Sequence, residues 1–501
     1  MNLASIVAEH DASRPALISR GRVTDYGTLR RQIDGMRGSL SALGVQRNDR
    51  VALVCGNSRA FVVSYLATVG LGAIAVPLNP LAPTPELQRE LEVVTPSVVV
   101  VEASGVPSFS GLALERLPLL RHVVLTDEQS ASSMASSLSV HSFDRLITAE
   151  PVAVVDVDRL QPAVLMFTSG TAGSPRAAIL THGNLMANIE QNERMPDHVR
   201  PDDVVFGVLP VFHIFGLNVV VGMSLHAGAC VVLIQRFDPV ATVETIEERG
   251  ITVLPGAPPV WVALSLLEGH DATHFAKVRL ALTGASRMPS DAIERLERKF
   301  GLVLREGYGL TEAAPVVTSS VGVPPRRDSV GQVVPGVEVR VIDSDGSDIL
   351  AGDSGEVLVR GDNVFVGYWN DPEATARVLD TDGWLHTGDI ATVDGDGYLY
   401  LLDRAKDLII VSGFNVFPAE VEEVLMRHPA VFEAGVIGVP HPQTGEAVRA
   451  YVVLKPGAEA DEDALIDHCH DHVARYKCPT KVLIVDALPH NHFGKLLRRS
   501  L

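Results

Sequence analysis

Residues 166–182 read MFTSGTAGSPRAAILTH and join two apolar runs through a turn of glycine, serine and threonine. Gly170 and Gly173 bracket several hydroxyl side chains, and Arg176 is the single arginine or lysine of the stretch. Backbone amides freed by glycine, together with hydroxyl donors, can wrap a phosphate group. The stretch lacks the Gly-Lys-Ser/Thr ending of the P-loop NTPases, so it indicates either another kind of phosphate loop or an ordinary surface loop.

Short β-branched runs alternate with helical patterns on both sides of this turn. Strands are predicted at RVALVCGN (50–57), AIAVPLNP (73–80) and SVVVVEAS (97–104), with helices at 58–72 and 84–94 between them. The same alternation recurs through residues 229–301. It predicts an α/β architecture with largely parallel sheets.

The pattern changes in the last third of the chain. Residues 331–400 contain short alternating runs with Asp-Gly turns, which predict antiparallel strands. After Asp403 the order of a helix, two strands and a second helix predicts a small α+β domain. With 501 residues the chain is long enough for two domains, which we place at residues 1–403 and 404–501.

Bulk composition excludes several classes of function. The formal net charge of −19 repels nucleic acid and anionic lipid at long range. The N-terminus has no basic n-region, and prolines or a histidine interrupt the longest apolar runs, so we expect a cytoplasmic protein without a membrane span. The four cysteines form no CxxC pair, which favours reduced, buried thiols. Weak peripheral membrane contact and homo-oligomerisation are left open.

Six further stretches, in order along the chain, resemble motifs of the acyl-adenylate-forming superfamily, which includes acyl-CoA synthetases, peptide-synthetase adenylation domains and luciferases. They are PVFHIFG (210–216), LTGASRM (282–288), EGYGLTE (306–312), GWLHTGD (383–389), DRAKDLIIVSGFNVFPAEVEEVL (403–425) and HFGKLLRR (492–499). The resemblance covers nearly the whole chain. It implies a large N-terminal domain of two α/β sheets and a small β-barrel, followed by a small mobile α+β domain.

The superfamily's phosphate loop reads Thr-Ser-Gly-Thr-Thr-Gly-x-Pro-Lys-Gly, and residues 168–177 resemble it. The chain departs from this pattern at Ala172, Arg176 and Ala177. Arg176 keeps the positive charge, but a guanidinium is a planar fork whereas an ammonium is a point charge. The exchange puts the strength of phosphate binding at this loop in question.

The resemblance implies a role for each matched residue. Tyr308 would stack on adenine, Thr311 would hydrogen-bond the α-phosphate, and Glu312 together with Thr168 would ligate Mg²⁺. Asp389 would accept hydrogen bonds from the ribose. The other residues implied to contact the nucleotide are Ser169, Gly170, Thr171, Gly173, Arg176, Gly284, Ala285, Ser286, Glu306, Gly307, Gly309 and Arg404.

Other matched residues would act on the acid and on CoA. Lys495 would place its ammonium between the carboxylate of the acid and the α-phosphorus, which is an electrostatic task. Lys406 falls at the hinge about which the C-terminal domain of the resembling enzymes rotates. His213 stands where amino-acid-activating relatives have an aspartate, so we expect it to gate the acyl or CoA channel. The residues implied to face the pantetheine of CoA are Ser412, Gly413 and Phe414.

These features predict an ATP- and Mg²⁺-dependent acid–CoA ligase that forms an acyl-AMP and pyrophosphate, and then an acyl-CoA thioester and AMP. A fatty acid is the preferred substrate because PGAPPVW (255–261) and EGYGLTE look most like fatty-acyl ligases, although aryl-acid ligases use similar motifs. Two alternatives stay open: an acyl-AMP ligase that delivers to a carrier protein, and a degenerate nucleotide-binding protein.

The histidine-rich stretch HCHDH (468–472) is a separate candidate for metal binding. Its first and last histidines lie one helical turn apart, but no distant set of ligands is identifiable. We therefore interpret it as a solvated helix end.

Overall fold

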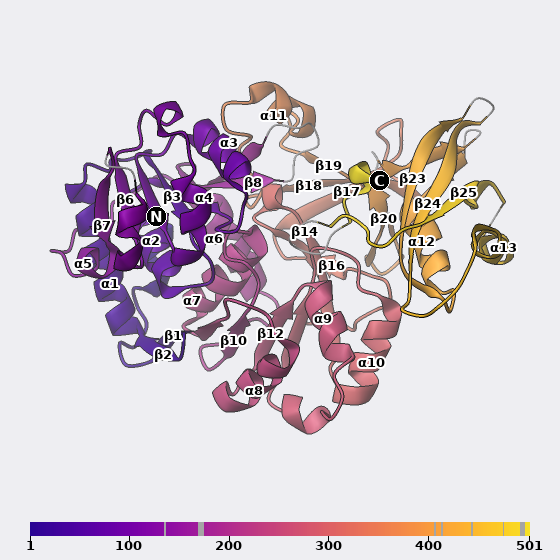
Figure 1. Cartoon of the computed structure of the whole chain (residues 1–501), viewed down its shortest axis with the longest axis horizontal. Helices are drawn as coiled ribbons and strands as arrows, with labels where there is room; N and C mark the ends of the chain where they lie inside the picture. Colours follow the sequence, from indigo (N-terminus) through magenta and orange to yellow (C-terminus); the bar gives the residue numbers. More distant parts are fainter. Residues whose placement is uncertain are drawn as a thin grey trace. The chain divides into compact units, whose positions relative to one another are not determined.

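The computed structural model of the chain describes residues 1–134, 137–168, 175–404, 407–411, 414–441, 444–473, 475–490 and 496–501. The chain divides into two compact units (Figure 1). Unit 1 comprises Met1–Arg327, Gly331–Glu338 and Val359–Leu385, and unit 2 comprises Asp328–Val330, Val339–Leu358 and His386–Leu501. The predicted hinge residue Lys406 lies outside the described residues, so the boundary near residue 404 stays a prediction.

A seven-stranded sheet forms the first core of unit 1. Its strands, in spatial order, are β7 (Ser139–Ser142), β6 (His122–Leu125), β5 (Val98–Val101), β3 (Arg50–Val54), β4 (Ile74–Leu78), β8 (Pro162–Thr168) and β9 (Arg176–Thr181). The pairs are parallel except for the antiparallel β8–β9 pair. All four valines of β5 are fully buried, as expected for a parallel strand covered on both faces.

A nine-stranded sheet forms the second core of unit 1. Its order is β16 (Gln332–Val333), β15 (Val316–Ser319), β14 (Leu304–Gly309), β13 (Leu280–Thr283), β12 (Val253–Gly256), β10 (Val204–Gly207), β11 (Cys230–Leu233), β1 (Pro15–Ser19) and β2 (Arg22–Asp25). The pairs from β14 to β1 are parallel, whereas both ends of the sheet are antiparallel. The sequence prediction of largely parallel sheets is confirmed.

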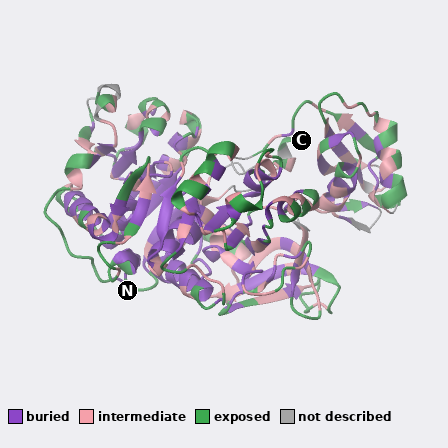
Figure 2. Cartoon of the chain, turned by 90° about the horizontal axis from the view of Figure 1, so that it is seen from below, coloured by how far each residue is buried: buried purple, intermediate pink, exposed green. Residues whose placement is uncertain are grey.

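Helices cover the faces of these sheets, and buried residues are concentrated in the strands (Figure 2). The main helices of unit 1 are α1 (Tyr26–Ala42), α2 (Arg59–Gly70), α3 (Thr84–Val94), α6 (His182–Glu193), α7 (Met223–Ala227), α8 (Pro239–Arg249), α9 (Pro258–Ser265), α10 (Ser290–Phe300) and α11 (Pro372–Val378). Local chemistry sets their ends: Ser58 accepts a hydrogen bond from the Phe61 amide at the start of α2, and Gly250 ends α8 with a φ of 65°.

A π-helix, Phe215–Gly222, leads directly into α7. Gly216 permits the close packing at its start, because a Cβ there would lie 2.1 Å from the carbonyl oxygen of Pro210. π-helical turns are rare and occur frequently at functional sites. This one belongs to the segment in which the sequence predicted a substrate gate.

The antiparallel strands predicted for residues 331–400 are present. They form a four-stranded sheet in the order β17 (Val337–Ile342), β18 (Ser354–Gly361), β19 (Leu385–Val393) and β20 (Leu399–Arg404). Within the described residues β17 and β20 are the edges of this sheet. The small β-barrel implied by the resemblance therefore takes the form of an open sheet.

The C-terminal part of unit 2 has its own core. Strands β22 (Phe414–Val416), β21 (Ile409–Val411), β24 (Gly445–Leu454) and β23 (Val431–His441) form one sheet, and β25 (Lys481–Ile484) pairs with β24. Helices α12 (Pro418–Met426) and α13 (Glu462–His472) contribute apolar side chains to the same core. This agrees with the α+β pattern predicted after Asp403.

All four cysteines are buried free thiols, as predicted. None of the described helices is both long enough and apolar enough to cross a membrane.

Candidate active site

The predicted phosphate loop connects two adjacent antiparallel strands of unit 1. Thr168 ends β8 and Arg176 begins β9, and the two residues are directly opposite each other in the β8–β9 pair. Both are half-buried. The β8–β9 pair thus closes the base of the predicted phosphate loop. The remaining loop residues predicted to bind phosphate, Ser169, Gly170, Thr171 and Gly173, lie outside the described residues.

The motifs LTGASRM (282–288) and EGYGLTE (306–312), which the resemblance assigns to the adenine site, follow neighbouring parallel strands. Gly284, Ala285 and Ser286 follow β13, and residues 306–309 (Glu306, Gly307, Tyr308 and Gly309) complete β14. The motifs approach closely, because a Cβ on Gly284 would lie 3.1 Å from the carbonyl oxygen of Gly307. Ligands of open α/β sheets bind beyond the carboxyl ends of the strands, and these residues lie at such an edge.

Backbone geometry explains two small residues of these motifs. Ala285 has a φ of 73°, a left-handed conformation that few residues other than glycine adopt without strain. At Gly309 a Cβ would lie 2.0 Å from the carbonyl oxygen of Pro315, so only glycine fits. The motif residues are therefore required partly by the path of the backbone.

The turn that carries Thr311 and Glu312 is held by buried amide side chains. The side-chain amides of Asn363 and Asn218 donate to the carbonyl oxygens of Ala313 and Ala314, each over 2.8 Å. Asn188 donates to the carbonyl oxygen of Val316 over 2.8 Å and accepts from the amide of the same residue over 3.1 Å. All three asparagines are at most 1% exposed, so water cannot replace these bonds.

Glu312 belongs to a network that also contains the phosphate-loop cation. The Tyr368 hydroxyl donates to Glu312 Oε1 over 2.7 Å. The Arg176 guanidinium lies over the Tyr368 ring, 5.9 Å from its centroid, and Arg176 Nε lies 3.4 Å from Asp371 Oδ2. Burial and the neighbouring Glu312 charge raise the pKa of Tyr368 well above its usual range, so its hydroxyl stays protonated and donates.

His213 begins the segment that contains the π-helix. Its backbone amide donates to the carbonyl oxygen of Pro210 over 3.0 Å, and its Nδ1 accepts from the amide of Phe215 over 3.3 Å. Burial lowers the pKa of His213 to about 4, so the ring is neutral at pH 7. The Phe215 ring in turn lies beside Gly284, where a Cβ would be 3.4 Å from it. The structure thus brings the gate segment to the adenine-site motifs.

Asp389 and Arg404 are cross-strand partners in unit 2, directly opposite each other in the β19–β20 pair. Asp389 is buried, and its backbone amide donates to Thr387 Oγ1 over 3.1 Å. Phe414 begins β22. The remaining predicted residues of this unit, Lys406, Ser412, Gly413 and Lys495, lie outside the described residues.

The described residues on both sides of Lys495 are firmly tied to unit 2. His490 and Leu496 form an antiparallel bridge, and His490 Nε2 hydrogen-bonds Glu433. Arg498 donates to both carboxylate oxygens of Glu422, over 2.9 and 2.6 Å, and lies 3.6 Å from Asp407. Two ends of a short segment are thus fixed by a backbone bridge and by charged side chains.

Glu312 and Thr168 supply oxygen donors of the kind that suits a hard cation which keeps other ligands. Among the described residues, no group of three or more histidine, cysteine, aspartate or glutamate side chains gathers to hold a metal ion. Glu312 supplies a half-buried carboxylate, and Thr168 supplies a hydroxyl. Magnesium is typically held by one or two carboxylates together with substrate phosphates and water, so these residues fit it.

The histidine-rich helix end differs from its prediction in part. His472 is exposed, as expected for a solvated helix end. His468 is half-buried instead, because its Nε2 donates to the carbonyl oxygen of Val424 over 2.9 Å and its ring packs against His428. Tertiary packing between α12 and α13 decides this burial.

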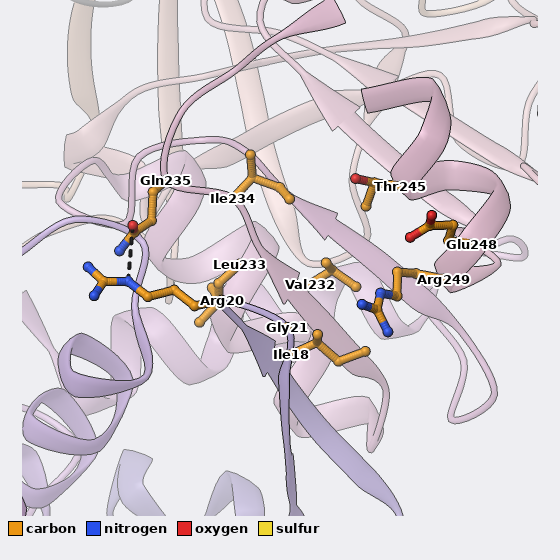
Figure 3. A pocket seen from close by; sticks show the side chains of 10 residues that line it. All are labelled: Ile18, Arg20, Gly21, Val232, Leu233, Ile234, Gln235, Thr245, Glu248 and Arg249. Atoms are coloured by element: carbon orange, nitrogen blue, oxygen red, sulfur yellow. Dashed lines mark hydrogen bonds between the residues drawn. The ribbon is translucent and has the colours of Figure 1, made fainter. Parts of the chain in front are cut away.

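A separate pocket of about 270 Å³ lies beside the end of β11 (Figure 3). None of the predicted site residues lines it. Arg20 lines one side, where its guanidinium is already paired with Gln235 and with the buried carboxylate of Glu102. The lining residues are Ile18, Arg20, Gly21, Val232, Leu233, Ile234, Gln235, Thr245, Glu248 and Arg249.

Sequence reasoning missed Tyr368 and the buried asparagines. Tyr368 lies in GYWND (367–371), a stretch whose aromatic and acidic residues stand between two turn signals. Asn184 and Asn188 are spaced by four residues on helix α6, which places them on one face. That spacing of buried amides was the available signal.

Comparison with known proteins agrees with the resemblance to the acyl-adenylate-forming superfamily. The family model described as AMP-binding enzyme matches residues 5–369, and the model of the AMP-binding enzyme C-terminal domain matches residues 420–495. The chain is 36% identical to a long-chain-fatty-acid–CoA ligase of Yersinia pestis, over 98% of this chain and 91% of that protein. It is 33% identical to 4-coumarate–CoA ligase 5 of Oryza sativa subsp. japonica, over 96% of this chain and 89% of that protein.

Solved structures show the same fold over the whole chain. The ATP-bound MatB of Rhodopseudomonas palustris superposes with a TM-score of 0.90 at 31% identity, covering 100% of this chain and 98% of that one. The chain therefore belongs to the AMP-binding enzyme family, the acyl-adenylate-forming superfamily. Within that superfamily its class is the AMP-dependent acyl-CoA synthetases.

Proposed function

We propose that the chain is an ATP- and Mg²⁺-dependent ligase that joins a fatty acid to CoA through an acyl-AMP intermediate. The observation that carries the choice of an acid with an uncharged tail is the gate segment. His213 is neutral at pH 7, and the π-helix Phe215–Gly222 that follows it is mostly buried and apolar. A neutral, apolar wall favours a hydrocarbon tail, because a charged tail would lose its hydration there.

The residues of the site would divide the work of adenylation. Arg176 and the hydroxyls of the phosphate loop would hold the β- and γ-phosphates, and Tyr308 would stack on the adenine. Lys495 would stabilise the charge that develops as the carboxylate attacks the α-phosphorus. Magnesium bound at Glu312 would neutralise the departing pyrophosphate. Asp389 and Arg404 would bind the ribose.

The second step would use the C-terminal region. We place the hinge near Lys406, with residues 404–501 rotating about it between adenylation and thioester formation. Ser412, Gly413 and Phe414 would then face the pantetheine of CoA. The compact strands between Glu312 and Asp389 leave no inserted block of the kind that restrains this rotation in acyl-AMP ligases, which supports CoA as the acceptor.

The test is a substrate panel. Purified protein is incubated with ATP, Mg²⁺ and fatty acids of graded chain length, cinnamate-type and benzoate-type aryl acids and a dicarboxylic acid, with and without CoA. Pyrophosphate and thioester are both measured. We expect CoA-dependent thioester with the highest kcat/KM for a fatty acid.

Each other outcome identifies a specific error. A preference for aryl acids would overturn the fatty-acid assignment but keep the ligase, and it would agree with the similarity to the 4-coumarate ligases. Pyrophosphate release without thioester would indicate transfer to a carrier protein. No pyrophosphate with any acid would indicate a degenerate nucleotide-binding protein.

A further inference from the structure

Tyr368 occupies a central place among the charged groups of the unit 1 site. Its hydroxyl donates to Glu312 Oε1 over 2.7 Å, and its ring faces the guanidinium of Arg176. The same guanidinium lies against Asp371, three residues further along the chain. One short segment, residues 367–371, thus touches both the predicted metal-binding carboxylate and the cation of the phosphate loop.

The segment that carries Tyr368 is itself held in place. It pairs with the edge of β9 through the Ala178–Tyr368 bridge, and the Trp369 amide donates to the carbonyl oxygen of Ala177 over 2.8 Å. The Tyr368 amide donates to Thr375 Oγ1 over 2.9 Å, which connects the segment to α11. The Tyr368 side chain therefore has little freedom to move independently of the phosphate-loop strand.

The ring of Tyr368 is also fixed from the side of Glu312. Phe365 packs edge-on against it, with ring centroids 5.0 Å apart, and the Phe365 amide donates to the backbone carbonyl of Glu312 over 2.8 Å. Backbone and side chain of Glu312 are thus both bound by residues 365–368. A hydrogen bond to one oxygen of a carboxylate restricts the orientation of the whole group.

We propose that Tyr368 is a positioning residue that orients the Glu312 carboxylate for Mg²⁺ and couples it to Arg176. The proposal rests on the proposed function, in which Glu312 binds the metal. It also gives a physical reason for Arg176 in place of the family's lysine: a planar guanidinium can lie on the Tyr368 ring and pair with Asp371 at the same time, whereas an ammonium is a point charge.

The test is the Mg²⁺ dependence of the adenylation half-reaction, measured as acid-dependent exchange of pyrophosphate into ATP. Tyr368→Phe keeps the ring and removes the hydroxyl. We expect the apparent Mg²⁺ affinity to fall about tenfold or more, because one lost hydrogen bond to a charged group corresponds to roughly 10- to 100-fold, with a rate near wild type at saturating Mg²⁺. A merely structural role would lower the rate or the melting temperature without this shift in Mg²⁺ dependence.

Tyr26→Phe is the matched control. Its hydroxyl donates over 2.8 Å to the carbonyl oxygen of Ala229, and Tyr26 is fully buried in the same unit. This variant should keep the wild-type Mg²⁺ dependence. Equal Mg²⁺ dependence in Tyr368→Phe and Tyr26→Phe, at matched melting temperatures, would overturn the proposal.

A double-mutant cycle tests the coupling to the cation. Arg176→Lys keeps the charge but loses the planar contact with Tyr368, so its effect on Mg²⁺ affinity should be smaller in the Tyr368→Phe background than in wild type. Additive effects would overturn the coupling. Glu312→Gln distinguishes the metal assignment of Glu312 from the positioning role of Tyr368. If Glu312→Gln leaves the Mg²⁺ dependence unchanged, the metal assignment of the proposed function fails. If Glu312→Gln changes the Mg²⁺ dependence but Tyr368→Phe does not, only the positioning role is contradicted.

Discussion

Two short segments carry the predicted charged groups of the reaction, and the protein anchors them by different means. The phosphate loop of unit 1 is closed by the β8–β9 ladder and followed by Thr181 and His182, which are both fully buried. The segment of unit 2 that contains Lys495 is flanked by the hydrogen bond between His490 and Glu433 and by the ion pair between Arg498 and Glu422. Arg498 and Glu422 keep 18% and 11% of their side-chain surface exposed.

This difference in anchoring indicates which of the two segments is held more rigidly. A buried ladder with neutral hydrogen bonds is costly to open, because its polar groups would lose their partners without gaining water. Ion pairs that water partly reaches are weaker and are screened by salt. We therefore expect unit 1 to act as a rigid binding surface, and the anchoring of the Lys495 segment to be more sensitive to solution conditions.

The largest expected effect concerns Lys495→Ala. Loss of the ammonium should lower the adenylation rate by a factor on the order of 10³ or more, since charge stabilisation of the transition state is lost. Thioester formation from supplied acyl-AMP should be largely spared, because the lysine is assigned to the first step. Equal loss in both half-reactions, measured separately, would contradict this role.

The second largest expected effect concerns the ion pair between Arg498 and Glu422, which flanks the Lys495 segment of unit 2. Arg498→Met leaves the Glu422 carboxylate without its bidentate partner, and the adenylation rate should fall about tenfold, which corresponds to about 1.4 kcal/mol. The control is Arg427→Met, which removes an exposed pair with Glu423 on α12. Pyrophosphate exchange measures both variants. Equal rates would show that the ion pair does not support the lysine segment.

The anchor of unit 1 should respond to acid through His182. Burial, with the N-terminal ammonium and Arg47, lowers the pKa of His182 to about 4 from an ordinary value of 6.5. A lowered folded-state pKa means that this stability is present above pH 6.5 and is lost as the pH falls towards 4. His182→Asn should remove this loss, which is on the order of 1 kcal/mol or about 2–4 °C between pH 7.5 and pH 5.

Thermal melts at both pH values measure this difference. His226→Asn, at a partly exposed histidine of α7, serves as the control. His182→Asn should lower the melting temperature at pH 7.5, because it changes a fully buried side chain whose Nδ1 accepts the Leu3 amide. An acid-induced loss as large in His182→Asn as in wild type would show that other groups cause it.

The smallest effect concerns alkaline stability. One oxygen of Glu90, on α3, is buried without a hydrogen-bond partner, and burial together with Glu86 raises the pKa of Glu90 to about 8. A raised carboxyl pKa gives stability that is present below pH 4.5 and is lost as the pH rises through 8. Glu90→Gln should therefore raise the melting temperature at pH 9 by about 2 °C, raise it less at pH 6, and change it little at pH 4.5.

Glu92→Gln is the comparison for that measurement. Its carboxylate pairs with Arg116, so the variant loses an ion pair and should show no gain at pH 9. A gain of similar size in both variants would attribute the effect to net charge rather than to the buried Glu90 oxygen.

Sequence patterns predicted the layers of the fold well, because each layer has a local signal. The runs at 50–57 and 97–104 became β3 and β5, and the helix at 84–94 became α3 with the predicted bounds. Helix α10 (Ser290–Phe300) likewise lies in the last part of the strand–helix alternation predicted for residues 229–301. Period and turn chemistry act within a few residues, so one sequence is enough to read them.

The sequence could not predict which distant residues would meet. Nothing local connects Tyr368 with Glu312, or Arg176 with Asp371, since these pairs form only when residues 367–369 add to the edge of β9. The interpretation of residues 468–472 as a solvated helix end was only partly right for the same reason, because His468 hydrogen-bonds Val424 of α12 and is half-buried.

The amino-acid sequence by itself determined the class of fold, the positions of the glycines that the backbone path requires, and the set of charged and aromatic residues available for adenylation. These follow from local periodicity, from steric limits on φ and from motif chemistry. Only the tertiary structure decided that buried asparagines hold the Glu312 turn, that His213 is neutral, and that Tyr368 lies between a carboxylate and a guanidinium. Burial and hydrogen-bond pairing depend on chain segments far apart in sequence, so they exist only once the sheets have formed.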